Sequence, residues 1–256
     1  MKEIFRISSI IIAKNEAQNI RRCIESQINC IDEIIVLIDK DTNDETVEIV
    51  KSFPKVKWEI IKWMGYGKTK QYGVDKSENE WILWIDADEA LTLGLQDEIL
   101  KFKSENPNYF VYKIARRAFF LGKWIKHSGW YPNYVSRLFN RKYARFSTSK
   151  VHETLVYNCE AGKLNNDLEH YTDPNIFHYY EKFNRYTSLA AAELKTKGKS
   201  AKLNDLLLRP FFIFVKMYIL KQGFLDGIQG FMLAVFSANY VFTKYSKLWE
   251  LKNRTN

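Results

Sequence analysis

Residues 81–90 read WILWIDADEA and join a compact apolar run to a cluster of acids. The apolar part, WILWI at 81–85, is short and rich in aromatic and branched side chains, which is typical of a buried strand. Asp86, Asp88 and Glu89 follow at once. Carboxylates this close repel one another and resist leaving water, so either a positive partner holds them or they lie open to solvent. The rest of the chain has to distinguish between these two possibilities.

Three similar apolar runs precede this stretch, and helical patterns separate them. The runs are SSIIIA at 8–13, EIIVLI at 33–38 and VKWEII at 56–61. Helices are predicted over about 16–27, after a capping box formed by Thr42 and Glu45, and behind the glycine-punctuated loop that starts at Gly65. Strands that alternate with helices predict an α/β fold with a mostly parallel sheet. Such sheets bind ligands beyond the carboxyl ends of their strands.

The chain changes character twice after this first part. We therefore expect three parts, at 1–105, 106–200 and 201–256, and the middle part would suit a substrate-facing half. The middle part is expected to be α+β. It has a predicted helix near 93–104, predicted strands at 109–117 and 151–157, and a predicted helix at about 181–197.

The C-terminal segment is apolar and aromatic, with basic residues at its tips. A membrane-spanning helix needs about 20 almost uncharged residues, and Lys216, Lys221 and Asp226 interrupt these runs. The preferred interpretation is a pair of amphipathic helices that lie on a membrane surface. The alternative is a helical cap packed on a soluble domain.

Composition limits the class of protein. With 256 residues and 46% hydrophobic content, the chain can bury a real core. A net charge of +9 favours an anionic partner. No RRM, KH or helix-turn-helix pattern supports nucleic acid as that partner, so no nucleic acid is expected. Three cysteines without CxxC spacing indicate neither a disulfide framework nor a zinc site, which fits a cytoplasmic setting.

The acid cluster itself suggests a metal site. Along an extended strand Asp86 and Asp88 would share one face while Ala87 points into the fold. Two carboxylates at the carboxyl end of a strand suit a hard divalent cation, with water and ligand phosphates as further ligands. The alternative is a solvated loop that leads to a helix capped by Thr92.

Residues near the ends of other strands favour the functional interpretation. Asp39 follows the second predicted strand, where a carboxylate can accept a hydrogen bond from a ribose or a base edge. Lys68 and Lys70 follow the glycine-punctuated loop, where a cation can meet a diphosphate. Together these positions outline a site for a nucleotide.

Several stretches carry a resemblance to a known family. They are SSIIIAKNEAQNIRRCIES from residue 8, EIIVLIDKDTNDETVEI from residue 33, GYGKTKQYGVDKSENEWILWIDADE from residue 65, GWYPNYVSRLFNRKYARF from residue 129 and VHE from residue 151. Together they resemble the inverting family 2 glycosyltransferases, and more narrowly the WaaE-type lipopolysaccharide-core and lipooligosaccharide β-glucosyltransferases. The similarity extends over nearly the whole chain, C-terminal segment included.

The resemblance implies a GT-A fold and a nucleotide-sugar donor, usually a UDP-sugar, with 1–105 as the nucleotide-sugar-binding half and 106–200 as the acceptor-binding half. It also implies Mg²⁺ or Mn²⁺ at the D-x-D motif, with Asp88 as the direct ligand, Asp86 nearer the ribose and Asp39 facing the uridine. The chain departs from the family after the second strand, where Lys40 and Asp41 stand in place of the usual Ser-Gly pair.

Inverting transfer also needs a base that takes the proton of the attacking hydroxyl. Glu153 matches the family's V-H-E and is the predicted catalytic base, with an exposed strand residue as the alternative. Asp173 is the second candidate. Trp130 and Tyr131 are predicted to stack on the acceptor sugar, although packing in the protein would use the same aromatic faces.

The basic side chains Arg137 and Arg141 have two open interpretations, since they can attract phosphate or simply lie in solvent.

The sequence therefore predicts a metal-dependent, inverting glycosyltransferase. It would move a hexose, with glucose as the first candidate, from a UDP-sugar to a lipopolysaccharide-core or other lipid-linked saccharide. The expected location is the cytoplasmic face of the inner membrane, as a peripheral protein bound to the membrane surface. The alternative function is a catalytically inactive, nucleotide-binding membrane adaptor with the same fold.

Overall fold

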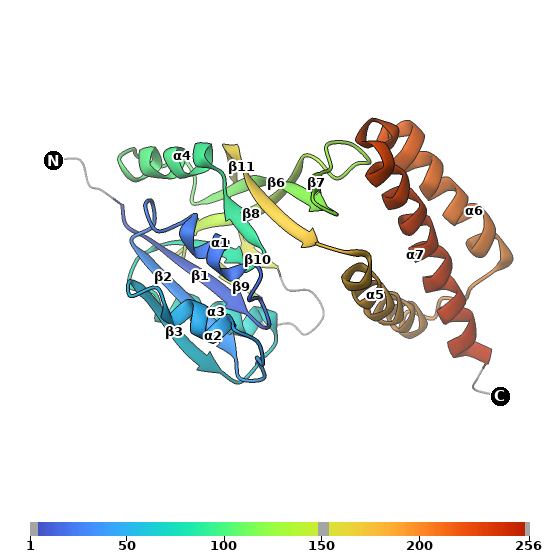
Figure 1. The fold of residues 1–256 in the computed structure, drawn as a ribbon, viewed down its shortest axis with the longest axis horizontal. Coiled ribbons are helices and arrows are strands. Elements are labelled where there is room, and N and C mark those ends of the chain that lie inside the picture. Colours follow the sequence, from blue (N-terminus) through green and yellow to red (C-terminus); the bar gives the residue numbers. More distant parts are fainter. Residues whose placement is uncertain (1–4, 148–153, 254–256) are drawn as a thin grey trace. The chain divides into compact units, whose positions relative to one another are not determined.

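The structure is a computed structural model that describes residues 5–147 and 154–253. The chain divides into two compact units (Figure 1). We call Met1–Arg116 with Asn133–His170 the sheet unit, and Arg117–Pro132 with Tyr171–Asn256 the helical unit. These boundaries follow contacts along the chain. The expected donor-binding role of 1–105, acceptor-binding role of 106–200 and membrane-associating or capping role of 201–256 stay predictions.

Four parallel strands form one half of the main sheet. They lie in the order β3 (Val56–Ile61), β2 (Glu33–Asp39), β1 (Ile7–Ala13) and β4 (Trp81–Asp86). All four were predicted from their apolar runs, and the parallel pairing is confirmed. Parallel pairing brings the carboxyl ends of these strands to the same edge of the sheet.

An extension continues the sheet beyond β4. Its order is β8 (Asn133–Asn140), β6 (Val111–Phe120), β11 (Gly162–Asp173) and β5 (Glu89–Leu91), and the short β7 (Lys123–Trp124) pairs with β6. The β4–β8, β8–β6, β6–β7 and β11–β5 pairs are antiparallel. A separate ribbon joins β9 (Ala144–Phe146) to β10 (Leu155–Tyr157). The sequence predicted only β6 and part of β10, because polar residues interrupt the alternation in β8 and β11. Residues 151–153 of the predicted strand lie outside the described part of the chain.

The helices of the sheet unit correct some sequence-based boundaries. They are α1 (Ile20–Glu25), α2 (Thr46–Lys51), α3 (Tyr66–Lys76) and α4 (Leu93–Lys103). The capping box predicted at Thr42 and Glu45 is wrong, since α2 begins at Thr46 and Asp44 Oδ1 accepts from its backbone N–H at 3.0 Å. The predicted cap is confirmed at Thr92, whose side chain accepts from the backbone N–H of Leu95.

The glycine-punctuated segment is helical for most of its length. Helix α3 begins at Tyr66, directly after Gly65, so Lys68 and Lys70 project from the first turns of a helix and not from a loop. Gly65 adopts φ +91°, a backbone conformation that favours glycine, and this explains why the helix starts where it does.

Alternate residues of β4 pack on opposite faces of the sheet. Trp81, Leu83 and Ile85 belong to one apolar cluster, together with side chains of α1 and α4. Ile82 and the half-buried Trp84 pack in a second cluster, which includes Val74 of α3. This two-residue period is the pattern expected of a strand that is buried on both faces of the sheet.

The helical unit consists mainly of three helices. They are α5 (Ile176–Thr196), α6 (Leu203–Phe214) and α7 (Gly227–Asn253), and α7 lies beside both of the others (Figure 1). A π-helical turn (Val215–Leu220) and a 3₁₀ turn (Gly223–Asp226) connect α6 to α7. Among the described residues, none of the helices combines the length and apolarity that crossing a membrane requires.

Gly73 tests the packing of α3 on the sheet. A Cβ at this position would lie 2.5 Å from Ile10 Cγ2 and 3.3 Å from Leu37 Cδ1. Gly73→Ala should therefore lower the free energy of unfolding by about 1–3 kcal/mol, because overpacking outweighs the gain in helix propensity of about 1 kcal/mol. Urea unfolding measures this change. Asp75→Ala on the exposed side of the same helix is the control and should change stability by less than about 0.5 kcal/mol.

Candidate active site

The acids predicted to bind the donor lie at the carboxyl edge of the parallel strands. Asp39 is the last residue of β2 and Asp86 is the last residue of β4. Both strands flank β1, where Asp86 pairs with Ile12 in the strand register. The topology therefore brings two sequence-distant carboxylates to one edge of the sheet, which is where ligands bind in open α/β sheets.

Arg137 holds the acid cluster together. Its Nη2 atom lies 2.7 Å from Asp86 Oδ2 and 2.5 Å from Glu89 Oε1. The side chains of Arg137 and Glu89 are 1% and 0% exposed, and the guanidinium stacks 3.5 Å from the centroid of the Trp84 ring. Arg116 adds a second cation, 3.6 Å from Glu89 Oε1. Protein cations thus relieve the repulsion that the sequence WILWIDADEA implies.

This arrangement separates the two carboxylates chemically. Burial raises the pKa of Glu89 above its ordinary value, and Arg137 opposes this effect only in part. Burial also acts to raise the pKa of Asp86, but Arg137 and Lys70 outweigh it and hold that pKa well below the usual range. Asp86 is accordingly an anion at neutral pH.

The chain turns immediately after β4. Asp86 ends the strand, residues 87–88 form a turn, and the backbone N–H of Asp86 donates to Glu89 Oε2 at 3.0 Å. Ala87 is buried in the core, as expected from the alternation. Glu89 is also buried, so the alternative of a solvated loop is wrong for this residue.

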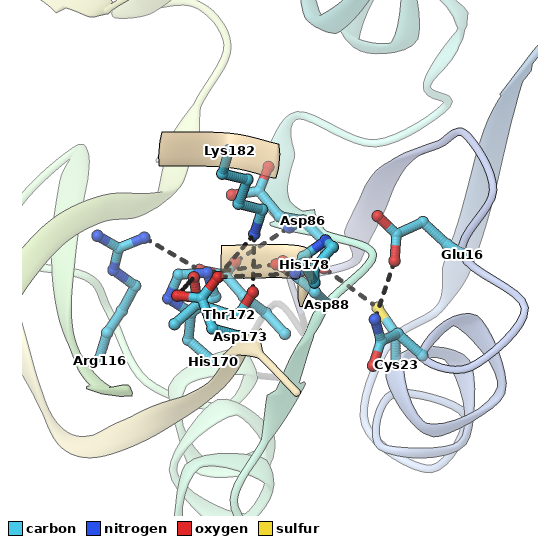
Figure 2. A network of polar contacts seen from close by, with 12 residues as sticks. Glu16, Cys23, Asp86, Asp88, Arg116, His170, Thr172, Asp173, His178 and Lys182 are labelled. Atoms are coloured by element: carbon cyan, nitrogen blue, oxygen red, sulfur yellow. Dashed lines mark hydrogen bonds and ion pairs between the residues drawn. The ribbon is translucent and has the colours of Figure 1, made fainter. Parts of the chain in front are cut away.

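Asp88 faces a histidine from a distant strand. His170 Nε2 in β11 lies 3.4 Å from Asp88 Oδ2, and Figure 2 shows the two side chains pointing toward each other. A carboxylate oxygen and an imidazole nitrogen are both ligands that Mn²⁺ accepts, and the carboxylate also suits Mg²⁺. Among the described residues, no group of three or more His, Cys, Asp or Glu side chains is arranged to hold a metal. The pair therefore fits a cation whose remaining ligands are water and ligand phosphates.

Asp39 is held in a defined orientation. Its side chain is 2% exposed, Oδ2 lies 3.2 Å from Lys14 Nζ, and Oδ1 accepts from the backbone N–H of Asp41 at 2.9 Å. The hydrogen bond from Asp41 and the nearby Lys14 keep the pKa of Asp39 below its ordinary value. This hydrogen bond uses only the backbone of Asp41, so a glycine at this position would supply the same donor.

The two predicted diphosphate lysines differ in their surroundings. Lys70 Nζ lies 3.9 Å from Asp86 Oδ1 and 3.8 Å from the centroid of the Trp84 ring, and its side chain is 12% exposed. Lys68 is exposed on the same helix. Lys70 therefore already contributes to the acid cluster, whereas Lys68 faces solvent.

The predicted acceptor residues belong to the helical unit. Trp130 packs against a cluster that contains Phe120 and Leu233, and Tyr131 meets the Trp124 ring edge-on at 5.3 Å. Both are half-buried, so each keeps some surface for a ligand. Their role in acceptor binding stays a prediction.

The two candidate bases are placed differently. Glu153 lies outside the described residues. Asp173 belongs to the helical unit, where its Oδ1 lies 3.6 Å from His178 Nδ1 and 3.7 Å from Lys182 Nζ; Figure 2 shows these side chains together.

Sequence reasoning missed several side chains of the site. The sequence assigned no role to His170, and it left Arg137 and Arg141 with two interpretations, phosphate binding or exposure to solvent. Arg141 is exposed, as one of its two interpretations expected, and its Nη1 also donates to the carbonyls of Val74 and Ser77. The sequence pointed to Arg137 only indirectly, because the repulsion among Asp86, Asp88 and Glu89 called for a cation without identifying it.

Comparisons with known proteins give a consistent result. The sequence pattern of "Glycosyl transferase family 2" matches residues 8–160. A glycosyltransferase of Rickettsia prowazekii (strain Madrid E) is 34% identical over 96% of this chain and 87% of its own length. The lipopolysaccharide core biosynthesis glycosyltransferase LpsC of Rhizobium meliloti (strain 1021) is 28% identical over 98% of this chain and 95% of its own.

A solved structure shares the fold. The mannosyltransferase PcManGT from Pyrobaculum calidifontis, in complex with GDP-Man and Mn²⁺, aligns over 96% of this chain and 87% of its own with a TM-score of 0.54 and 13% identity. This likeness confirms the fold class predicted from the sequence.

The buried cluster should be essential for stability. Arg137→Met leaves Glu89 buried without its nearest cation, so the free energy of unfolding at neutral pH should fall by about 3–5 kcal/mol. Because burial raises the pKa of Glu89, the folded variant can neutralise this carboxyl by protonation, and its deficit should shrink as the pH falls toward about 5. Urea unfolding at two pH values measures both effects.

Lys142→Met is the matched control for this variant. It breaks an exposed ion pair with Glu80 and should cost less than about 1 kcal/mol at either pH. Equal losses for the two variants would contradict the role assigned to Arg137.

Proposed function

The chain is a glycosyltransferase that belongs to glycosyl transferase family 2, and on this premise we propose that it moves a hexose, with glucose as the first candidate, from a UDP-sugar to a lipopolysaccharide-core or other lipid-linked saccharide. The observation that carries the proposal is the gathering of Asp39, Asp86 and Asp88 around the carboxyl edge of a GT-A sheet, with His170 opposite Asp88. A site of this composition suits a nucleoside diphosphate.

The donor would lie along this edge. In the proposal Asp39 accepts hydrogen bonds from the base or ribose, Asp86 lies nearer the ribose, and Lys68 with Lys70 faces the diphosphate. The solved mannosyltransferase of like fold binds GDP-Man, which supports a nucleotide-sugar donor in general. The choice of uridine depends on the residues that follow Asp39.

A divalent cation, Mg²⁺ or Mn²⁺, would be held by Asp88 and His170. When bound, it neutralises negative charge that grows on a departing diphosphate. Mn²⁺ in the mannosyltransferase complex supports this cofactor class. Asp86 is already engaged by Arg137 at 2.7 Å, which favours Asp88 as the direct ligand.

The acceptor needs a base and an apolar surface. A carboxylate would take the proton of the acceptor hydroxyl while its oxygen bonds to the anomeric carbon and the bond to the diphosphate oxygen breaks, with inversion. Glu153 is the first candidate for this base and Asp173 the second. Trp130 and Tyr131 would stack on the acceptor sugar.

A lipid-linked acceptor would place the enzyme at a membrane surface, and we propose the cytoplasmic face of the inner membrane. The similarity to LpsC supports an acceptor of the lipopolysaccharide core.

The metal assignment predicts a specific loss of activity. Asp88→Asn should lower Mn²⁺-dependent hydrolysis or transfer from a UDP-sugar by at least about 100-fold, because the carboxylate ligand is removed. His170→Asn should raise the Mn²⁺ concentration needed for half-maximal activity. A panel of UDP- and GDP-sugars with released nucleoside diphosphate as the readout measures both.

Asp97→Asn on exposed α4 is the matched control and should leave activity unchanged. Full activity of Asp88→Asn would exclude the metal role. If the wild type binds UDP without turnover of any donor or acceptor, the inactive adaptor becomes the better description.

The two candidate bases can be separated by substitution. Glu153→Gln should lower kcat for transfer to lipopolysaccharide with a truncated core by about 10²–10⁴-fold, with UDP binding unchanged, because only proton removal is lost. Asp173→Asn should have a smaller effect. The reverse order would assign the base to Asp173.

A further inference from the structure

The helical unit exposes a broad apolar surface around α6 and the turns that follow it. Six large side chains between residues 207 and 228 are each 58% to 68% exposed: Leu207, Leu208, Phe211, Phe212, Leu220 and Ile228. We call this set the outer apolar face. Isolated exposed apolar residues are ordinary, but a contiguous group of this size marks an interaction surface.

The spacing within α6 shows that the exposure is not incidental. Residues 207, 208, 211 and 212 recur at helical intervals and therefore lie on one side of the helix. Another side of α6 packs on α7 (Figure 1). A helix in a water-soluble protein normally turns polar residues outward, whereas α6 turns four large apolar ones outward.

The exposed charged side chains in the segment that carries this face are all basic. Exposed basic residues between 199 and 235 are Lys199, Lys202, Arg209, Lys216 and Lys221. The same range contains two acids, and both are engaged within the protein. Asp205 accepts from the backbone N–H of Lys202 and from Arg209.

Asp226 is the second acid, and it is 2% exposed. Its carboxylate accepts from the backbone N–H groups of Lys126 and His127 at 3.1 Å and 2.9 Å. The outward surface of this segment therefore combines large apolar side chains with basic ones.

We propose that the outer apolar face docks on a lipid bilayer that contains anionic lipids, with Phe211, Phe212 and their neighbours below the headgroups and the lysines among the phosphates. Apolar burial and attraction of basic residues to anionic lipid act together at such surfaces. Docking of a second copy of the chain on this face would instead bring two positively charged surfaces together, and they would repel each other. This inference gives the membrane partner proposed above a defined surface, and it does not depend on catalysis.

The same region holds the loop that carries the candidate acceptor residues. The backbone N–H of Ser128 donates to the Lys221 carbonyl at 2.9 Å, and Lys123 Nζ donates to the Asp226 carbonyl at 2.7 Å. Gly223 permits this close approach, because a Cβ there would lie 2.6 Å from Ser128 Oγ and 2.8 Å from the Met217 carbonyl. Docking at the turns would thus keep the loop that ends in Trp130 and Tyr131 near the bilayer, where a lipid-linked saccharide is presented.

Vesicle flotation of the full-length protein tests the apolar part of the proposal. The wild type should bind phosphatidylcholine vesicles that contain phosphatidylglycerol. The double variant Leu208→Gln/Phe212→Gln should bind at least about tenfold more weakly, because two apolar side chains no longer leave water. Leu93→Gln, at a position 79% exposed on α4, is the matched control and should bind like the wild type.

The charged part has its own variants. Lys216→Gln and Lys221→Gln should each weaken binding about fivefold, and salt should do the same. Lys55→Gln and Lys62→Gln, at exposed positions of the sheet unit, are the controls and should have no effect.

Two outcomes would overturn the proposal. The first is that the wild type does not float with anionic vesicles, or that the Leu208→Gln/Phe212→Gln variant and the lysine variants float as well as the wild type does. The second is that the wild type does not bind vesicles but sediments as an oligomer, whereas the Leu208→Gln/Phe212→Gln variant sediments as a monomer. The face would then be a subunit interface. Metal-dependent donor hydrolysis, measured without vesicles, reports on the glycosyltransferase proposal separately.

Discussion

The burial of one guanidinium between two carboxylates is the interaction on which the candidate active site depends. Asp86 and Glu89 come from the end of β4 and from β5, and Arg137 comes from β8. Without the cation, the turn between the two acids would place like charges side by side in a largely buried setting, which costs several kcal/mol. Arg137 therefore joins the extension beyond β4 to the parallel half of the sheet at the point where the donor is proposed to bind.

The charge balance of this region suits an anionic ligand with a bound cation. Asp86, Asp88 and Glu89 supply three carboxylates, and Arg137, Arg116 and Lys70 supply three cations within 4 Å of Asp86 or Glu89. The protein's own charges thus nearly cancel, so the charge of any bound divalent ion remains available to a diphosphate. Burial also distinguishes two of these carboxylates. Glu89 is 0% exposed and paired with Arg137, whereas Asp88 is 20% exposed beside His170.

The helical unit carries two proposed contacts, one with the membrane and one with the acceptor, and hydrogen bonds connect the segments that make them. The turns around Gly223 and Asp226 face outward with apolar and basic side chains, and they also hold the loop that leads to Trp130. An enzyme that acts on a lipid-linked saccharide has to find its acceptor at an interface and orient it there. The hydrogen bonds between the turns and the loop would couple the two proposed contacts.

The sequence by itself determined the parallel half of the sheet, the position of Asp39 and Asp86 at its carboxyl edge, and the family. These features are local, because apolar runs, their two-residue period and motif residues can be recognised within short segments. The apolar and basic character of the C-terminal segment was equally visible. The sequence located the helix N-caps less reliably, as the wrong prediction at Thr42 illustrates. Several neighbouring side chains can accept the same backbone hydrogen bonds.

Only the tertiary structure decided which side chains complete the site. His170 reaches Asp88 from β11, and Arg137 reaches Asp86 from β8, across separations of 82 and 51 residues. Such contacts depend on the register of antiparallel strands whose polar residues hide their alternation, and a shift of one residue would turn each side chain to the opposite face. Charge repulsion among Asp86, Asp88 and Glu89 could be read from the sequence, but the cation that relieves it is set by the packing of distant strands.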